Sequence, residues 1–336
     1  MAPMSEMLAM VRTLGDQLRW ARDLEVPDLA AASEVLVGGM GGSGISGDFG
    51  AALASGSDGR VVVHKGYAPL PGWASRVKPV VVAASYSGNT EETLDLVAAA
   101  AESGLPIVTI TTGGRLAELT SQNKWPTIAV PVGLQPRAAI GYLAGAVARL
   151  LHALGMLPEQ TSALDESAEL VDGAVREGSV TWGVASELAK GLVGRISIVY
   201  GGGPISGTAA QRWKTQINEN AKMPAWWSVL PELDHNEIVG WETLPTTTRD
   251  LIGVVALTDS SDHPRVRDRL DHTSALTEFA VPWLAEVPAH GESELARLMS
   301  LTVCGDLVSW MLAVEAGVDP VPVETIEKLK KLLVKD

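Results

Sequence analysis

The sequence predicts an α/β protein in which two halves each form a mainly parallel, doubly wound sheet flanked by helices. Short apolar runs alternate with alanine- and leucine-rich stretches of helical periodicity, the pattern of parallel strands joined by crossover helices. The pattern occurs twice, and the segment Val35–Gly47 resembles Ile196–Gly207. We therefore expect two domains, residues 1–155 and 156–336, with the boundary falling within 155–180.

The first half is expected to begin with helical segments, because residues 1–24 have apolar residues at helical spacing. Its periodic stretches Thr90–Ala101 and Ala138–Leu157 predict further helices. The second of these is the most apolar helix candidate, but Arg149 and His152 interrupt it, which favours a buried helix over a membrane span. The expected strands are Val35–Val37, Val61–His64, Val80–Ala84, Ile107–Thr111 and Ile128–Val130.

The second half repeats this organisation with fewer recognisable strands. A helix is expected to begin after Gly207 and to end near Glu219, and two more cover Glu292–Ala316 and Ile326–Leu333. The expected strands are Ile196–Tyr200, Leu251–Leu257 and Leu276–Val281.

Composition excludes several classes of protein. The net charge of −14 opposes long-range attraction to nucleic acid or to an anionic membrane, so neither is an expected partner. The single cysteine, Cys304, lies in an apolar stretch and is expected to be a buried thiol, which favours a reducing compartment. Residues 1–24 lack the uninterrupted apolar core of a signal peptide. We therefore expect a cytoplasmic protein.

The segment Ser85–Thr90 carries the strongest functional signal, because it joins a predicted strand to a helix N-terminus. The hydroxyls of Ser85, Ser87 and Thr90 and the free N–H groups of the first helical turn can all face one anion, and the helix dipole favours negative charge there. The corresponding segment of the second half contains Asp259 and Asp262, whose carboxylates would repel a phosphate. The first half is therefore expected to hold the anion and the second to supply other groups.

The turn Gly39–Gly44 matches the G-x-G-x-x-G pattern of dinucleotide-binding folds. Such folds usually place an acidic residue after the second strand, whereas this strand ends in His64-Lys65, which would suit a 2′-phosphate. The hydroxyl-rich loop has no place in the dinucleotide pattern, so that alternative is the weaker one. The glycines could also serve packing alone. Ser43, inside the turn, is the residue expected to contact a ligand.

A polar constellation suited to proton transfer lies in the second half. Glu219 sits between two asparagines expected to orient its carboxylate, and His235 follows in a Pro-bounded loop. A carboxylate can move a proton between carbons, while an imidazole handles oxygen protons near neutral pH. The alternatives are a solvated helix carboxylate for Glu219, and a surface loop histidine or a helix cap for His235. Zinc, P-loop and nucleophile-elbow motifs do not occur in the sequence, and no metal or cofactor is expected.

Together these segments resemble the bifunctional phosphoglucose/phosphomannose isomerase family, which is built from two sugar isomerase (SIS) domains of flavodoxin-like, doubly wound topology. The resemblance extends from about residue 30 to the C-terminus. The hydroxyl loop marks only an SIS domain, whereas Asn-Glu-Asn followed by the histidine is more specific. The matching segments are Gly38–Ser43, Ser85–Thr90, Asn218–Asn220 and His235–Glu237.

The resemblance implies a role for each matching residue. Glu219 would shuttle a proton between C1 and C2 of a sugar phosphate through a cis-enediol, His235 would assist ring opening, and Arg137 would stabilise the enediolate. The residues implied to bind or support the phosphate are Ser43, Ser85, Ser87 and Thr90, with Gly41 and Gly42 supporting them.

A C-terminal lysine is also implied, and Lys328, Lys330 and Lys331 compete for that role. If the apolar residues of Ile326–Leu333 form a buried face, Lys330 lies nearest to it and is our choice. The alternative is a solvated lysine near the chain terminus.

The family is homodimeric, so the resemblance implies a homodimer in which the histidine reaches the partner's site. Glucose 6-phosphate and mannose 6-phosphate give the same enediol, and one site therefore suffices for both. Two alternatives stay open: a non-catalytic SIS protein that senses a phosphosugar, and an isomerase of another sugar phosphate.

Overall fold

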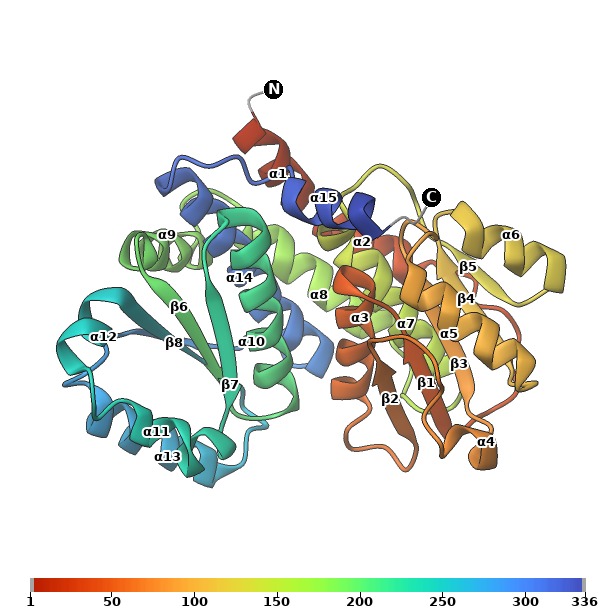
Figure 1. Cartoon of the computed structure of the whole chain (residues 1–336), viewed down its shortest axis with the longest axis horizontal. Coiled ribbons are helices and arrows are strands. Elements are labelled where there is room, and N and C mark those ends of the chain that lie inside the picture. Colours follow the sequence, from red (N-terminus) through yellow and green to blue (C-terminus); the bar gives the residue numbers. More distant parts are fainter. Residues whose placement is uncertain (1–2, 334–336) are drawn as a thin grey trace.

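The computed structural model describes residues 3–333, and its first half confirms the predicted five-stranded parallel sheet (Figure 1). The strand order is β2-β1-β3-β4-β5. Because β2 lies on one side of β1 and the later strands lie on the other side, the sheet is doubly wound. The helices here are α1 (Pro3–Arg12), α2 (Leu14–Arg22), α3 (Gly41–Leu53), α4 (Ala74–Val77), α5 (Glu91–Glu102), α6 (Gly114–Asn123), η1 (Pro136–Ala138) and α7 (Ile140–Ala153). The strands are β1 (Glu34–Gly38), β2 (Arg60–His64), β3 (Val80–Ser85), β4 (Ile107–Thr111) and β5 (Thr127–Ala129).

The second half contains a four-stranded parallel sheet of order β7-β6-β8-β9, which repeats the topology of the first. Its strands are β6 (Ile196–Gly201), β7 (Ala225–Val229), β8 (Ile252–Thr258) and β9 (Trp283–Pro288). The helices are α8 (Thr161–Ala174), α9 (Val180–Leu192), α10 (Pro204–Gln216), the π-helix η2 (Ile217–Ala221), the short η3 (Glu232–His235), α11 (Glu237–Gly240), α12 (Pro245–Leu251), α13 (Pro264–Thr277), α14 (Glu294–Glu315) and α15 (Glu324–Leu333).

Two features of the second sheet differ from the expectation. The predicted strand Leu276–Val281 is wrong, because α13 continues to Thr277 and the strand begins only at Trp283. Leu276 and Phe279 made that segment look like a strand, yet both are more than half exposed at the end of the helix. The edge strand β7 was not predicted, since its tryptophans lie in a short run among polar and proline residues.

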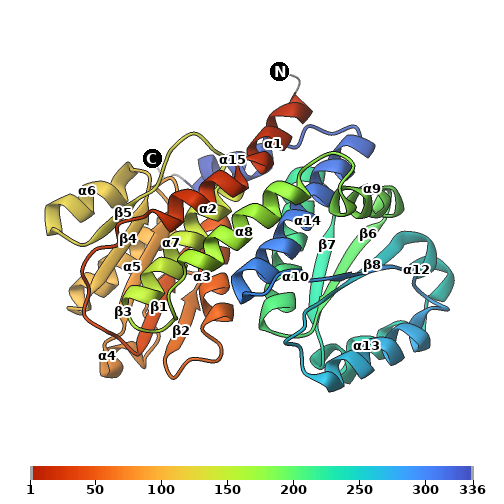
Figure 2. The same cartoon turned by 180° about the vertical axis from the view of Figure 1, so that it is seen from behind.

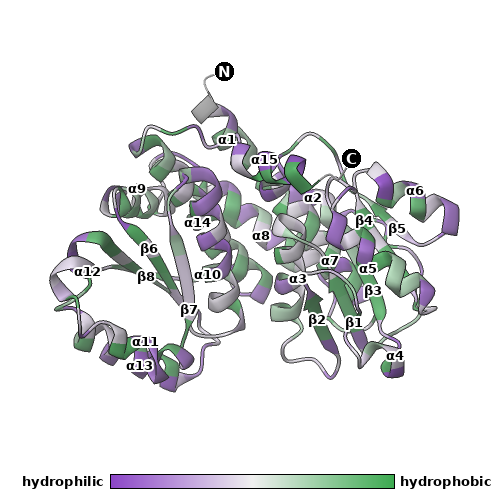
Figure 3. Cartoon of the chain, in the orientation of Figure 1, coloured by the Kyte–Doolittle hydropathy of each residue, from purple (hydrophilic) through white to green (hydrophobic). Residues whose placement is uncertain are grey.

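The most extensive cluster of buried apolar residues in the described part of the chain lies between the two sheets, where α2, α7, α8, α10 and α14 pack together (Figures 1 and 2). Smaller clusters cover the faces of the individual sheets. The helix α14 is long and apolar enough to cross a membrane, but 83% of its apolar window is buried inside the protein, as in a core helix. Figure 3 shows apolar residues concentrated in the strands and polar residues on outer helices such as α6. The helix α8 follows the predicted domain boundary at residue 155 and packs both on α2 of the first half and on α14 of the second. The boundary therefore stays a prediction.

The helix α15 is amphipathic, but its apolar face is not buried as expected. Ile326, Leu329, Leu332 and Leu333 are 42%, 56%, 82% and 57% exposed. The helix lies on the surface above the first half instead of packing on a sheet (Figure 1). The periodicity of the sequence correctly predicted the helix, but the expectation that its apolar face is buried against other residues was wrong.

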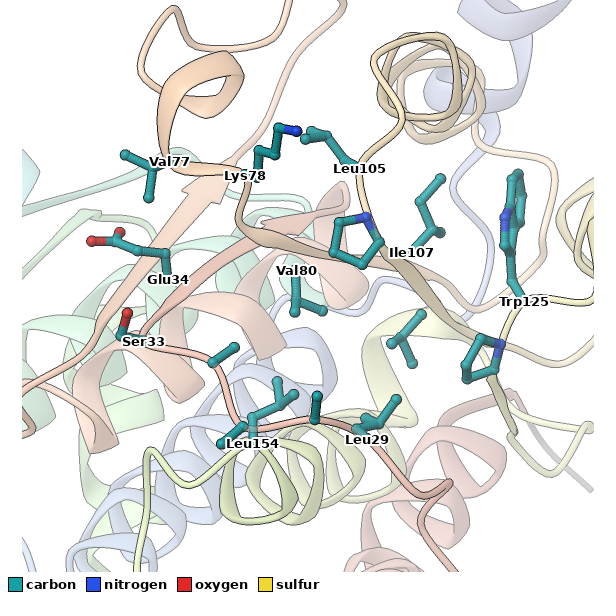
Figure 4. Close-up of a pocket in the computed structure, with 16 residues that line it drawn as sticks. Leu29, Ser33, Glu34, Val77, Lys78, Val80, Leu105, Ile107, Trp125 and Leu154 are labelled. Atoms are coloured by element: carbon teal, nitrogen blue, oxygen red, sulfur yellow. The ribbon is translucent and has the colours of Figure 1, made fainter.

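The two edges of the first sheet differ in character. At the amino-terminal edge, a cavity of about 590 Å³ is lined by the starts of β1, β3 and β4 with Glu34, Val80, Ile107 and Trp125 (Figure 4). At the carboxyl edge, β1 leads into the glycine-rich turn and β3 leads into the hydroxyl-rich loop. Ligands of doubly wound sheets bind at the carboxyl edge, so the candidate site lies opposite that cavity.

Candidate active site

The hydroxyl groups of the predicted phosphate site meet at the carboxyl edge of the first sheet. Ser43 lies in the first turn of α3, and its Oγ accepts a hydrogen bond from the backbone N–H of Tyr86 at 3.0 Å. Ser85 Oγ lies 2.9 Å from Thr90 Oγ1. Ser43 and Ser85 are buried, Thr90 is half-buried and Ser87 is exposed. The two buried hydroxyls fix the loop, while Ser87 and Thr90 stay accessible at the start of α5.

The glycine-rich turn, which contacts this loop through Ser43, also contacts a second functional segment, η1. Gly41 has φ +52°, a conformation that favours glycine. A Cβ on Gly42 would lie 2.5 Å from the carbonyl oxygen of Pro136, so only glycine permits this approach. The turn therefore packs directly on η1, which carries Arg137.

Arg137 links the two halves of the chain. Its side chain is 4% exposed, and Nε donates to Asn220 Oδ1 at 2.8 Å. Nη2 donates to the carbonyls of Pro320 and Val321 at 2.7 and 2.8 Å, and Nη1 lies 3.7 Å from Glu219 Oε2. Burial lowers the pKa of Arg137, and the Glu219 carboxylate opposes this shift. The guanidinium is thus held on two edges, with Nη1 directed at the candidate base.

Glu219 lies in η2, the π-helix that continues α10. The parent helix begins at Pro204, before Gly207 and not after it as expected. Single π-turns within helices often occur at functional sites. The flanking asparagines have other partners than expected, because Asn220 accepts from Arg137 and Asn218 donates to the carbonyl of Met223 at 2.8 Å. The asparagines therefore orient the arginine and the backbone, and the Glu219 side chain, 27% exposed, faces open space.

One cavity adjoins Glu219, and another adjoins the hydroxyl loop. One, of about 660 Å³, is lined by Glu219, Lys222 and Thr325 among others. The other, of about 440 Å³, is lined by Thr90 of the hydroxyl loop and by Lys330 of α15. The structure thus places Lys330 beside the predicted phosphate site, although its role stays a prediction.

The competing C-terminal lysines have different surroundings. Lys328 Nζ lies 3.3 Å from Glu324 Oε2 on the exposed side of α15. Neither Lys328 nor Lys331 lines the cavity beside the hydroxyl loop. This placement favours Lys330 among the three.

His235 is not brought to Glu219 within one chain. Glu219 precedes β7 and His235 follows it, and the strand's five residues span roughly 16 Å at about 3.3 Å per residue. His235 is exposed, but its backbone cannot easily move towards Glu219, because residues on either side of it are held by hydrogen bonds. Asp234 accepts from Arg269 at 2.9 Å, and Glu237 accepts from Ser228 Oγ at 2.7 Å.

The second half has a related turn, but a carboxylate fills it. Ser206 Oγ donates to the carboxylate of Asp262 at 3.1 Å, and the backbone N–H of Asp259 donates to the same carboxylate at 2.9 Å. The Asp262 side chain thus lies at the N-terminus of α10, where a bound anion would otherwise lie. Burial raises the pKa of Asp262 above its usual range. The turn of the second half is therefore occupied by a carboxylate of the protein itself, which explains why this half is not expected to bind an anion.

The structure also bears on possible metal ligands and on the environment of the single cysteine. Within residues 3–333, no group of three or more His, Cys, Asp or Glu side chains is arranged to hold a metal ion. Cys304 is buried as predicted, and burial raises the pKa of its thiol to about 12.

A doubly wound pair of domains, with a hydroxyl loop at one sheet edge and an arginine–glutamate contact between the halves, defines a phosphosugar isomerase of the SIS class. The family model for the bacterial phospho-glucose isomerase C-terminal SIS domain matches residues 183–333. The chain is 38% identical over 308 residues to the bifunctional phosphoglucose/phosphomannose isomerase of Caldicellulosiruptor bescii, covering 89% of each chain. It is 35% identical to the same-named enzyme of Aquifex aeolicus, covering 99% of each. The chain therefore belongs to the bifunctional phosphoglucose/phosphomannose isomerase family.

Solved structures agree on the fold. A glucose-6-phosphate isomerase like protein from Thermus thermophilus aligns with a TM-score of 0.59 and 22% identity, covering 98% of each chain. Tagatose-6-phosphate ketose/aldose isomerase from Escherichia coli aligns with a TM-score of 0.66 and 18% identity, covering 95% of this chain and 94% of that one. Both likenesses concern the fold alone.

Proposed function

We propose that this protein interconverts glucose 6-phosphate and mannose 6-phosphate with fructose 6-phosphate by proton transfer through a cis-enediol. The observation that carries the proposal is the contact of Arg137 with Glu219, next to the turn that packs on the hydroxyl loop. This arrangement offers a base, an oxyanion partner and an anion site, the three parts the reaction requires.

The proposed mechanism begins with binding of the phosphate by Ser87, Thr90 and the N-terminus of α5, with Lys330 nearby. Glu219 then removes the proton from C2 of the open-chain aldose, and the electron pair of that C–H bond forms the C1–C2 double bond. The carbonyl π electrons pass to O1, where Arg137 stabilises the negative charge. For the ketose, the proton of the O2 hydroxyl passes to O1, the O2 electrons form the C2 carbonyl and the C1–C2 π electrons take the proton that Glu219 returns to C1. Return of the proton to C2 re-forms the C1 carbonyl and gives either aldose epimer.

A homodimer completes the proposed site, because His235 lies at the far end of β7 from Glu219 in its own chain. The edge strand β7 exposes Trp226 and Trp227, which are 56% and 37% exposed. A two-fold axis at this edge would bring the partner's His235 towards Glu219, since the two β7 strands would run antiparallel. We place the protein in the cytoplasm, in keeping with its single buried thiol, Cys304.

A second candidate function comes from one relative. The D-glucosamine-6-phosphate 4-epimerase of Sulfolobus acidocaldarius is 33% identical over 217 residues, covering 64% of this chain and 66% of that one. A change of sugar within the same fold would leave the phosphate loop intact and alter the conversion. A non-catalytic sensor would likewise keep the loop and would need neither Glu219 nor Arg137.

Turnover assays distinguish these functions. We expect the purified protein to form fructose 6-phosphate from glucose 6-phosphate and from mannose 6-phosphate, and to leave unphosphorylated glucose unchanged at the same concentration. Glucosamine 6-phosphate serves as a separate substrate in parallel assays. Conversion of glucosamine 6-phosphate alone would support the epimerase, and binding of phosphosugars without any conversion would support the sensor.

A further inference from the structure

Arg137 is part of a closed ring of buried hydrogen bonds. Arg137 Nε donates to Asn220 Oδ1 at 2.8 Å, and Asn220 Nδ2 donates to Ser309 Oγ at 3.0 Å. Ser309 Oγ donates to the carbonyl of Asp306 at 2.9 Å. Arg212 Nη2 then donates to both carboxylate oxygens of Asp306 at 2.8 Å and to the carbonyl of Arg137 at 3.1 Å. The ring therefore holds Arg137 by its side chain and by its backbone.

All five members of this ring are at most 4% exposed. They come from four elements, since Arg137 lies on η1, Arg212 on α10, Asn220 on η2, and Asp306 and Ser309 on α14. Asp306 stands in the middle of the apolar core helix, where a carboxylate needs a compensating charge. The ring joins the first-half segment that carries Arg137 to the two central helices of the second half.

The arrangement is poorly suited to stabilisation alone. Burying an ion pair costs desolvation free energy that the attraction often fails to recover, so apolar residues commonly serve stability as well. Gln216 Nε2 also donates to Asp306, yet Gln216 Oε1 and Arg212 Nε have no hydrogen-bond partner within residues 3–333. A group that leaves buried polar atoms unpaired contributes less to folding than a fully satisfied one.

We propose that Asp306 and Ser309 are positioning residues for the isomerisation, which act through Asn220 and Arg212 to fix the Arg137 guanidinium against the developing enediolate. Neither side chain lines the cavity beside Glu219 or the cavity beside the hydroxyl loop. Their effect is expected on the transition state, because the phosphate is held elsewhere, at the hydroxyl loop. This inference rests on the proposed role of Arg137.

The test compares Ser309→Ala with Thr302→Val. Each change replaces one buried hydroxyl on α14, but Thr302 Oγ1 donates to the carbonyl of Leu298 and lies outside the ring. We expect Ser309→Ala to lower kcat about 3- to 10-fold with KM changed less than about 2-fold, since small displacements of a catalytic group reduce the chemical step. Thr302→Val should leave kcat unchanged.

One further variant, tested with two inhibitors, separates positioning from stability. Asp306→Asn removes the carboxylate charge, and we expect it to lower kcat by about 10- to 100-fold. A phosphorylated hydroxamate, whose planar anion resembles the enediolate, should bind more weakly by a similar factor, whereas the inhibition constant of inorganic phosphate should not change. If Asp306→Asn does not fold, Ser309→Ala decides the question alone.

Unchanged kcat in Ser309→Ala, or an equal loss in Thr302→Val, would overturn the inference. Arg137→Met serves as the reference for the proposed function. If Arg137→Met is strongly impaired while Ser309→Ala and Asp306→Asn lower only the melting temperature, the ring is structural and the function stands. Wild-type kcat in Arg137→Met would overturn the function and the inference together.

Discussion

Replacement of Glu219 by glutamine is expected to lower kcat for both sugar phosphates by roughly 10³- to 10⁴-fold, because the amide cannot accept the C2 proton. At about 1.4 kcal/mol per factor of ten, this corresponds to some 4 to 5.5 kcal/mol of transition-state stabilisation. The KM should change little, since the phosphate is bound at the hydroxyl loop. The fold should persist, because Arg137 retains its hydrogen bonds to Asn220, Pro320 and Val321.

The measurement is steady-state kinetics with glucose 6-phosphate and mannose 6-phosphate, accompanied by circular dichroism. Glu118→Gln is a matched control, because this exposed glutamate of α6 pairs with Arg115 at the surface. The control should retain wild-type kcat. A Glu219→Gln protein with more than a tenth of wild-type kcat would contradict the assignment of the base.

Mixing two inactive variants is expected to restore activity if His235 acts across the dimer. Glu219→Gln and His235→Ala each disable both sites of their own homodimer. A mixed dimer has one site with Glu219 from one subunit and His235 from the other, and one site that lacks both groups. With random association, an equal mixture should reach about one quarter of wild-type activity.

The two variants should carry different affinity tags and be unfolded and refolded together, so that mixed dimers can be isolated. The control mixture combines Glu219→Gln with a double variant that lacks both groups, and it should stay inactive. Recovery should be measured per dimer for the doubly tagged fraction, where half of the wild-type activity is expected. No recovery in that fraction would contradict a shared site.

Much of the fold was predictable because strands buried in parallel sheets are continuous apolar runs. All five strands of the first sheet were expected, and β6 and β8 of the second were as well. The edge strand β7 was missed, since an edge strand is less buried and its sequence carries a weaker apolar signal. The burial of α15 was wrongly predicted, because an amphipathic pattern identifies a face without revealing whether anything covers it.

Some parts of the candidate site were easier to predict from the sequence than others. The hydroxyl loop is contiguous in the sequence, so strand, turn and helix start were evident together. The contact between Arg137 and Glu219 joins segments far apart in the chain. The polar surroundings of Glu219 in the sequence suggested proton transfer, whereas only the family resemblance indicated a role for Arg137. The Asp306 ring was missed entirely. The one available signal was a carboxylate in the middle of an apolar helix, which indicates a buried partner without identifying it.

The most direct test of the account is isomerisation in D₂O with excess chelator, followed by NMR of the products. Proton transfer through an enediol predicts solvent deuterium at C1 of fructose 6-phosphate and at C2 of the mannose 6-phosphate formed from glucose 6-phosphate, because the Glu219 carboxyl is 27% exposed and can exchange its proton with solvent before returning it. The chelator should have no effect, and Glu219→Gln should incorporate none on the same time scale. Products that form at the wild-type rate without solvent deuterium would indicate direct hydride transfer, and loss of activity with chelator would indicate a metal. Either result would contradict the proposed mechanism.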